Sequence, residues 1–206
     1  MRLDLPPIIA ILRGVTPDRV VDVAYVLLAQ GIGAIEVPLN SPSPFESISK
    51  LANAIGRDCL CGAGTVLYAD DVSRVADAGG RLIVTPNTDL SVIERACAKD
   101  LMVIPGFATA TEAFAAIRAG ARQLKLFPAT TYGPDHLRAL RSVLPADIGV
   151  FAVGGVTVEN VALWRDAGAA GFGFGSDLFK PQYSDKEIET RARRLVEAVG
   201  ERKRTD

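Results

Sequence analysis

The sequence predicts an α/β protein, a single (β/α)8 TIM barrel formed by residues 1–206. Short apolar runs of strand character alternate eight times with amphipathic stretches of helix character, at about 20 to 25 residues per unit. A chain of 206 residues fills one barrel core but is too short for two. A doubly wound open sheet is the main alternative, but the eight units and the glycine-rich ends of the last two favour the barrel.

The expected strands are short runs rich in Ile, Val, Leu and Phe. We place them at residues 8–12, 34–39, 60–66, 82–86, 102–106, 123–129, 148–155 and 171–175.

Helical stretches fill the intervals between these strands. Capping or turn residues precede the first two helices, at Thr16-Pro17-Asp18 and at Ser41-Pro42. Glycines suited to helix C-caps close several of these stretches, at Gly31, Gly56, Gly79, Gly120 and Gly168.

Composition and charge narrow the possible partners and the cellular location. The net charge is -1, so no basic field favours nucleic acid or anionic lipid. The N-terminal apolar run is too short for a secretory leader, and no later stretch approaches a membrane span. We therefore expect a cytoplasmic protein with no nucleic-acid or membrane partner. The end ERKRTD, 201–206, is expected to be a frayed, solvated tail.

The metal-binding residue types are few. Cys59, Cys61 and Cys97 are expected to be structural thiols, because an odd number with a C-x-C pair in an apolar run does not suggest a redox or metal site. His136, the single histidine, is expected in an exposed first helical turn. No zinc site of the usual His or Cys type is therefore expected, and metal is predicted to play no part.

Two ionisable residues interrupt the apolar strands. Glu36 lies in Ala-Ile-Glu-Val-Pro-Leu and Lys125 in Gln-Leu-Lys-Leu-Phe-Pro. Strand alternation directs the apolar neighbours toward the helices and both charges into the barrel. Burial lowers a lysine pKa and yields a nucleophilic amine, whereas a nearby carboxylate raises that pKa and can relay protons. A structural Lys–Glu ion pair is the alternative reading.

Glycine-rich segments follow the last two expected strands. Gly154 and Gly155 come after the seventh, and Ser176 follows Gly-Phe-Gly after the eighth. Loops at these positions often bind phosphate through backbone N–H groups, and glycine permits close approach. A lone Gly-Gly would mark only a tight turn, but two such segments together favour a phosphate site.

Other residues at the same strand ends are candidate substrate contacts. Arg13 ends the first strand and suits a carboxylate or phosphate, with a surface ion pair as the alternative. Asn40 and Thr65 follow the second and third strands, and Pro86 and Phe127 are expected to shape the floor of the site.

The chain resembles the KDPG/KHG aldolase family, class I enzymes that cleave 2-keto-3-deoxy-6-phospho sugar acids. The resemblance extends over nearly the whole chain. Its motifs are ILRG (11–14), IEVPLNSP (35–42), GAGTVL (62–67), VTPN (84–87), IPGFATATEA (104–113), LKLFPA (124–129), FAVGGVT (151–157) and GSDL (175–178).

The resemblance implies a reaction and a set of roles. Lys125 would form the Schiff base and Glu36 would transfer protons, releasing pyruvate and glyceraldehyde 3-phosphate without metal or organic cofactor. A homotrimer is also implied. The implied contacts are Gly154, Gly155 and Ser176 for the phosphate, and Thr65 for the pyruvate part.

Two positions bear on the substrate within this family. The phosphogluconate-cleaving members carry Arg where this chain has Asn40 and Thr where it has Val153. Because Val153 cannot donate a hydrogen bond to the C4 hydroxyl, the galacto-configured substrate is favoured and the phosphogluconate is the alternative. Two other classes remain open: an isomerase or epimerase in which Lys125 acts only electrostatically, and a catalytically silent sugar-phosphate sensor.

Overall fold

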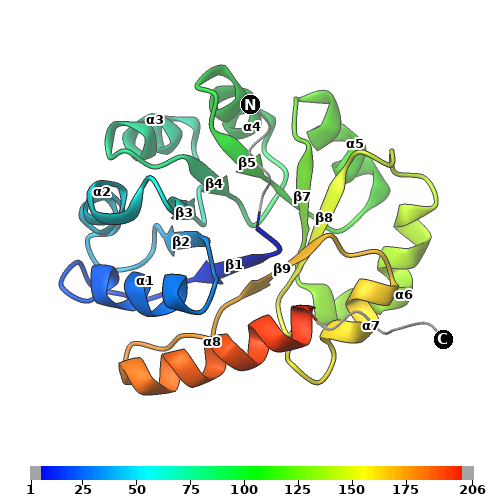
Figure 1. Cartoon of the computed structure of the whole chain (residues 1–206). Coiled ribbons are helices and arrows are strands. Elements are labelled where there is room, and N and C mark those ends of the chain that lie inside the picture. Colours follow the sequence, from blue (N-terminus) through cyan, green and yellow to red (C-terminus); the bar gives the residue numbers. More distant parts are fainter. Residues whose placement is uncertain (1–5, 201–206) are drawn as a thin grey trace.

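The computed structural model describes residues 6–200, and these form a nearly closed barrel of parallel strands surrounded by helices (Figure 1). The predicted barrel fold is therefore confirmed, and the open sheet is not. The expected solvated tail at 201–206 lies outside the described residues, as do residues 1–5 of the predicted apolar N-terminus.

Nine strands form the sheet of the described residues, in the order β5-β4-β3-β2-β1-β9-β8-β7-β6. Every neighbouring pair is parallel. The strands are β1 (Ile8–Ile11), β2 (Ala34–Pro38), β3 (Leu60–Gly64), β4 (Leu82–Val84), β5 (Met102–Ile104), β6 (Gly106–Phe107), β7 (Gln123–Leu126), β8 (Gly149–Val153) and β9 (Gly171–Phe174).

The fifth predicted strand, 102–106, is divided in two at Pro105. Its first part, β5, pairs with β4, and its second part, β6, pairs with β7. Proline has no N–H to donate to a ladder, which interrupts the strand. The Pro105 carbonyl still accepts from the Lys125 N–H at 2.8 Å. The strands at the two ends of the sheet order, β5 and β6, are thus joined through Pro105, and this connection closes the barrel.

Apart from the divided fifth strand, every predicted strand ends earlier than expected, and two of these ends bear on the site. The strand predicted at 123–129 stops at Leu126, because Pro128 is already the N-cap of the next helix. The strand predicted at 148–155 stops at Val153, because Gly154 and Gly155 have positive φ angles of 99° and 78°. The residues beyond both strands therefore belong to loops at the barrel mouth.

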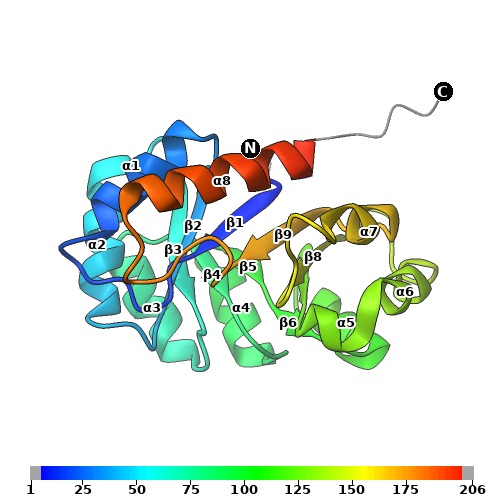
Figure 2. The same cartoon turned by 90° about the horizontal axis from the view of Figure 1, so that it is seen from below.

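Eight helices cover the described part of the barrel (Figures 1 and 2). Figure 2 shows the last of them lying along the outside beside the first. They are α1 (Val20–Ala29), α2 (Pro44–Ile55), α3 (Ala69–Asp77), α4 (Leu90–Ala98), α5 (Ala110–Arg118), α6 (Ala129–Arg141), α7 (Val161–Asp166) and α8 (Asp185–Gly200).

The helix ends match the predicted caps only in part. Gly31, Gly79, Gly120 and Gly168 have the positive φ expected after a helix, but Gly56 keeps a right-handed φ of -61°. The predicted turn at Thr16-Pro17-Asp18 is present, since the Thr16 carbonyl accepts from the Arg19 N–H at 3.0 Å. The N-caps of α1 and α2 are instead Arg19 and Ser43, without side-chain cap bonds. The Ser41 hydroxyl instead accepts from the Gly14 N–H at 2.9 Å, joining the loops after β1 and β2.

Two apolar cores lie on opposite faces of the sheet. The larger packs the outer face against the helices, and includes Ile35, Val37, Leu124 and Leu126. The smaller fills the barrel interior, with Ile9, Ile11, Ala34, Leu60, Leu82, Val84, Ile104, Phe151 and Val153. This division follows from strand alternation, which sends successive side chains to opposite faces.

Within residues 6–200, no helix combines the length and the apolar character needed to cross a membrane.

Candidate active site

Glu36 and Lys125 lie inside the barrel, as alternation predicts. Their neighbours along the strands belong to the outer core, so both charged side chains share the interior face with residues such as Phe151. Only 2% of Glu36 and 7% of Lys125 is exposed. Two ionisable groups are therefore held in the apolar interior of the barrel, an environment that shifts the pKa of each group.

Burial dominates the pKa of both groups. Loss of hydration lowers the pKa of the Lys125 ammonium, Glu36 opposes this effect, and Arg13 lowers the pKa further. Burial raises the pKa of Glu36, while Lys125 and Arg13 lower it. Because desolvation is the largest cause for each, the barrel favours the neutral amine and the neutral acid.

The described residues contain no direct ion pair between Glu36 and Lys125. The Glu36 Oε2 atom is buried without a hydrogen-bond partner, and the Lys125 Nζ lies 4.7 Å from the Phe127 ring centroid. An unpaired buried carboxylate lowers stability, and its presence favours a functional role over the structural ion-pair reading.

A glycine makes room for the Glu36 carboxylate. In the ladder between β2 and β3, Pro38 is opposite Gly64, and a Cβ added at Gly64 would lie 1.2 Å from Glu36 Oε2. The carboxylate therefore occupies the space that any side chain at position 64 would fill. Packing against Glu36 therefore explains why the second glycine of the GAGT sequence, Gly64, has no side chain.

Arg13 joins the ends of the first three strands. Its guanidinium donates to the Asn40 amide oxygen at 2.6 Å and, more weakly, to the Thr65 hydroxyl at 3.4 Å. Arg13 and Asn40 are exposed, and Thr65 is half-buried with a φ of 55°. No described carboxylate pairs with Arg13, so the surface ion-pair reading finds no support.

A cavity of about 550 Å³ opens at the C-terminal ends of β1, β8 and β9. Of the predicted substrate contacts, its lining includes Arg13, Phe127, Val153, Gly154, Gly155 and Ser176. Phe127 packs against the interior core and Val153 belongs to it, so the cavity borders the barrel interior at these two residues. Glu36 and Lys125 are not part of the cavity lining. The cavity has room for a small phosphorylated acid.

Backbone N–H groups gather on one side of this cavity. Among the described residues, the amides of Gly155 and Ser176 donate to no protein acceptor. A Cβ at Gly155 would lie 2.5 Å from the Thr130 side chain, so this position needs glycine for space as well as for its φ. Free amides beside a cavity are suited to bind an anion.

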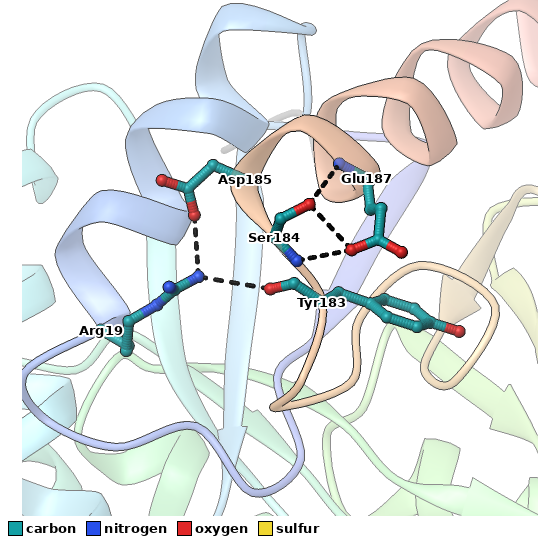
Figure 3. Close-up of polar contacts among 5 residues, drawn as sticks. All are labelled: Arg19, Tyr183, Ser184, Asp185 and Glu187. Carbon is teal, nitrogen blue, oxygen red and sulfur yellow. Dashed lines mark hydrogen bonds and ion pairs between the residues drawn. The ribbon is translucent and has the colours of Figure 1, made fainter.

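The loop between β9 and α8 forms one wall of the cavity. Figure 3 shows the contacts that hold the end of this loop at the start of α8. Arg19 donates to Asp185 at 2.7 Å and to the Tyr183 carbonyl at 3.5 Å. Ser184 and Glu187 form a reciprocal cap at the start of α8, with the Ser184 N–H donating to Glu187 at 2.7 Å. These contacts fix the base of the loop that presents Ser176.

Some predicted positions lie elsewhere. Pro86 is half-buried against Gly106 and does not line the cavity. Asn40 and Thr65 do not line the cavity either, but both accept hydrogen bonds from Arg13, which does. His136 was expected to be exposed but is half-buried, because its Nε2 contacts the Ala108 carbonyl at 2.6 Å.

Sequence reasoning missed other lining residues, among them Thr157, Asp177, Lys180 and Pro181. Three of these lie within five residues after Ser176, and that position in the chain was the available signal. Within residues 6–200, no three His, Cys, Asp or Glu side chains cluster as metal ligands would.

Comparison with known proteins gives consistent matches over nearly the whole chain. A 2-dehydro-3-deoxy-6-phosphogalactonate aldolase of Escherichia coli (strain K12) is 49% identical over 195 residues, covering 95% of each chain. A solved structure described as native KDPGal has a TM-score of 0.92 and 49% identity, covering 94% of each chain. A cube-shaped cage designed by fusing symmetric oligomeric domains also has a TM-score of 0.92 and 49% identity, over 93% of this chain and 71% of the cage chain.

The family match agrees with these similarities and with the geometry of the barrel mouth. It covers residues 1–193 and describes the family as KDPG and KHG aldolase. With a buried lysine and carboxylate beneath a cavity bordered by free amides, the chain belongs to the KDPG/KHG aldolase family of carbon–carbon lyases.

Proposed function

We propose that this protein is a class I aldolase that cleaves 2-dehydro-3-deoxy-6-phosphogalactonate into pyruvate and D-glyceraldehyde 3-phosphate, as a step of galactonate degradation. Lys125 forms the Schiff base and Glu36 transfers the protons. The observation that carries the proposal is the burial of Lys125, whose pKa is lowered by desolvation, beside an unpaired buried carboxyl group. The family match and the similarity to the E. coli enzyme support the reaction and the substrate.

The first half of the reaction uses the lowered pKa of Lys125. Its neutral amine attacks the C2 ketone, and Glu36 supplies the proton needed to expel the former ketone oxygen as water. The product is a protonated imine that can accept an electron pair from the C3–C4 bond. An acid with a raised pKa is suited to this step because it keeps its proton to a higher pH than an ordinary glutamate does.

Glu36 acts as a base in the bond-cleavage step, whereas it acts as an acid in imine formation. Its carboxylate, directly or through a water, removes the C4 hydroxyl proton as the C3–C4 bond breaks and the aldehyde leaves. The remaining enamine takes a proton at C3, and hydrolysis of the imine releases pyruvate and restores the Lys125 amine. Neither a metal nor an organic cofactor enters this sequence.

The remaining predicted residues position the substrate. Gly154, Gly155 and Ser176 would bind the phosphate, and this remote binding energy would hold C4 near Glu36. The Arg13 group, with Asn40 and Thr65, would bind the carboxylate end of the substrate. Pro86 and Phe127 would shape the floor around the reacting carbons, and Val153 would face C4.

The deciding experiment is mass spectrometry of intact protein after incubation with pyruvate and sodium borohydride. The wild type should gain one reduced pyruvate adduct, and Lys125→Ala should gain none, because no other lysine of residues 6–200 is buried. Lys186→Ala, on the exposed surface of α8, is the matched control and should retain the adduct.

The same experiment separates the competing functions. A folded wild type that forms no adduct would exclude the Schiff-base mechanism. Exchange of substrate hydrogen without carbon–carbon cleavage would then indicate an isomerase or epimerase, and binding without any turnover would indicate a sugar-phosphate sensor.

We also propose that the protein acts in the cytoplasm as a single-domain homotrimer. Exposed apolar side chains support an oligomer: Leu67 and Tyr68 precede α3, and Leu90 begins the neighbouring α4. The cage built from symmetric oligomeric domains contains a chain similar to this one. Light scattering in solution tests the trimer, and a monomer mass of 21.8 kDa would contradict it.

A further inference from the structure

The two carbonyl groups of the Gly154-Gly155 pair are both held from outside the cavity. Thr130, in the first turn of α6, donates to the Gly154 carbonyl from its N–H at 3.1 Å and from its hydroxyl at 3.2 Å. Asn160, the residue before α7, donates to the Gly155 carbonyl from its side-chain amide at 2.9 Å. Neither Thr130 nor Asn160 lines the cavity.

The orientation of a carbonyl fixes the orientation of the next N–H. In a trans peptide the C=O and N–H bonds point in opposite directions across the peptide plane, and both peptides here are trans. Because the Gly154 and Gly155 carbonyls point toward Thr130 and Asn160, the N–H groups of Gly155 and Val156 point away from them. Gly155 and Val156 both line the cavity.

Asn160 also holds the far side of the same loop. Its side-chain oxygen accepts from the Thr157 N–H at 2.9 Å, so one amide group binds the loop at two points. The positive φ angles of Gly154 and Gly155 allow the intervening backbone to take this shape. Thr130 in α6 and Asn160 at the N-cap of α7 thus determine the direction of the Gly155 and Val156 N–H groups.

From this geometry we propose that Thr130 and Asn160 are positioning residues for recognition of the substrate's phosphate. They bind the carbonyl side of the Gly154-Gly155 loop and thereby aim its N–H groups at the anion before it arrives. The inference rests on the proposed function, since it assigns the phosphate of that substrate to this loop. A preorganised donor group binds an anion more tightly than a loop that must first reorient.

A merely structural role for these hydrogen bonds leads to a different expectation. Loss of a structural bond would lower stability and would reduce the rate with every substrate alike. Loss of a positioning bond should act only on ligands that carry the phosphate. The matched pair of aldehydes, glyceraldehyde 3-phosphate and glyceraldehyde, separates these two possibilities when each is condensed with pyruvate.

The experiment compares kcat/KM for the two aldehydes in the wild type, Thr130→Val, Asn160→Ala and the double variant. Each single variant should reduce the preference for the phosphorylated aldehyde by about fivefold to tenfold, mainly through KM, as expected for one lost hydrogen bond. Pyruvate trapping by borohydride should be unchanged, because pyruvate has no phosphate. Thr130→Ser retains the hydroxyl and should restore the preference.

Thr131→Val is the matched control, because Thr131 is an exposed neighbour whose hydroxyl makes no hydrogen bond among the described residues. It should leave the preference unchanged. Equal losses with both aldehydes, or a preference that survives in the double variant, would overturn the proposal.

Phosphate binding can be measured independently of turnover, by calorimetry with inorganic phosphate as the probe. Weaker phosphate binding by Thr130→Val and Asn160→Ala than by Thr131→Val supports the positioning role even if the wild type forms no imine. Equal binding by all three contradicts it. A failed imine test with intact phosphate binding would therefore overturn the proposed aldolase reaction and not this inference.

Discussion

The barrel interior, or lumen, and the barrel mouth around the cavity, or rim, present opposite kinds of polar group. In the lumen, Glu36 and Lys125 are ionisable side chains almost fully removed from water, and the Glu36 Oε2 has no hydrogen-bond partner. At the rim, Gly155 and Ser176 offer backbone amides at the edge of an open cavity. The first arrangement lowers stability to make groups reactive, whereas the second places neutral dipoles that require little desolvation.

This difference supports the proposed roles, in which the lumen reacts with a ketone and the rim holds a phosphate. A cation placed beside Lys125 to bind the phosphate would alter the lysine's proton equilibrium, as Arg13 already does to a small extent. Uncharged amides bind an anion without adding a full charge to the lumen. Chemistry and anchoring are thereby kept electrostatically separate.

The largest expected effect comes from Glu36→Gln, which keeps the shape of the side chain and removes its proton transfer. We expect kcat to fall by about 10² to 10⁴. The loss should be equal for glyceraldehyde 3-phosphate and glyceraldehyde, because the lumen acts on the reacting carbons and not on the phosphate. Steady-state kinetics with both aldehydes measure this.

The control for this prediction is Glu94→Gln on the exposed side of α4, which should retain wild-type rates. The melting temperature of Glu36→Gln should not fall, since an unpaired buried acid is removed. A variant that loses only its preference for the phosphorylated aldehyde would contradict the division between lumen and rim.

A smaller effect is expected in the pH dependence of imine formation. The reactive species is the neutral amine, so the rate should rise by about tenfold per pH unit below the Lys125 pKa and level off above it. Because burial lowers this pKa, the plateau should begin below the value of about 10.4 for an ordinary lysine. Borohydride trapping of pyruvate at a series of pH values gives the profile.

Two variants should move this profile in opposite directions. Glu36→Gln removes a charge that raises the Lys125 pKa, so the plateau should begin at lower pH. Arg13→Met removes a charge that lowers it, so the plateau should begin at higher pH. Shifts of the same sign in both variants would show that desolvation and charge do not act on Lys125 as described.

Periodicity predicted the fold well because each unit repeats the same local pattern. The eight strand positions and the inward direction of Glu36 and Lys125 are fixed by alternation and burial within single strands. The division of the fifth strand at Pro105 was not predicted, because the apolar run continues through it. The hydrogen bond from Gly14 to the Ser41 hydroxyl was not predicted, because it joins distant parts of the chain.

The candidate site was predictable where function depends on a side chain and not where it depends on backbone direction. Lys125 is conspicuous in an apolar strand, and glycines mark the rim. Thr130 and Asn160 have no such signal, because their contribution is apparent only from the carbonyls that they bind. The burial of His136 was likewise set by a carbonyl 28 residues away in the chain, at Ala108.

The smallest expected effect concerns Val153, which belongs to the interior core and also lines the cavity. Val153→Thr keeps the shape of the side chain and adds a hydroxyl at the boundary between lumen and rim. One new hydrogen bond to the C4 hydroxyl should shift the ratio of kcat/KM by about fivefold toward 2-dehydro-3-deoxy-6-phosphogluconate. Val153→Ala adds no donor and should leave the ratio between the two epimers unchanged. If both variants shift the ratio equally, the space at position 153 and not its polarity selects the C4 configuration, and the boundary residue acts by shape alone.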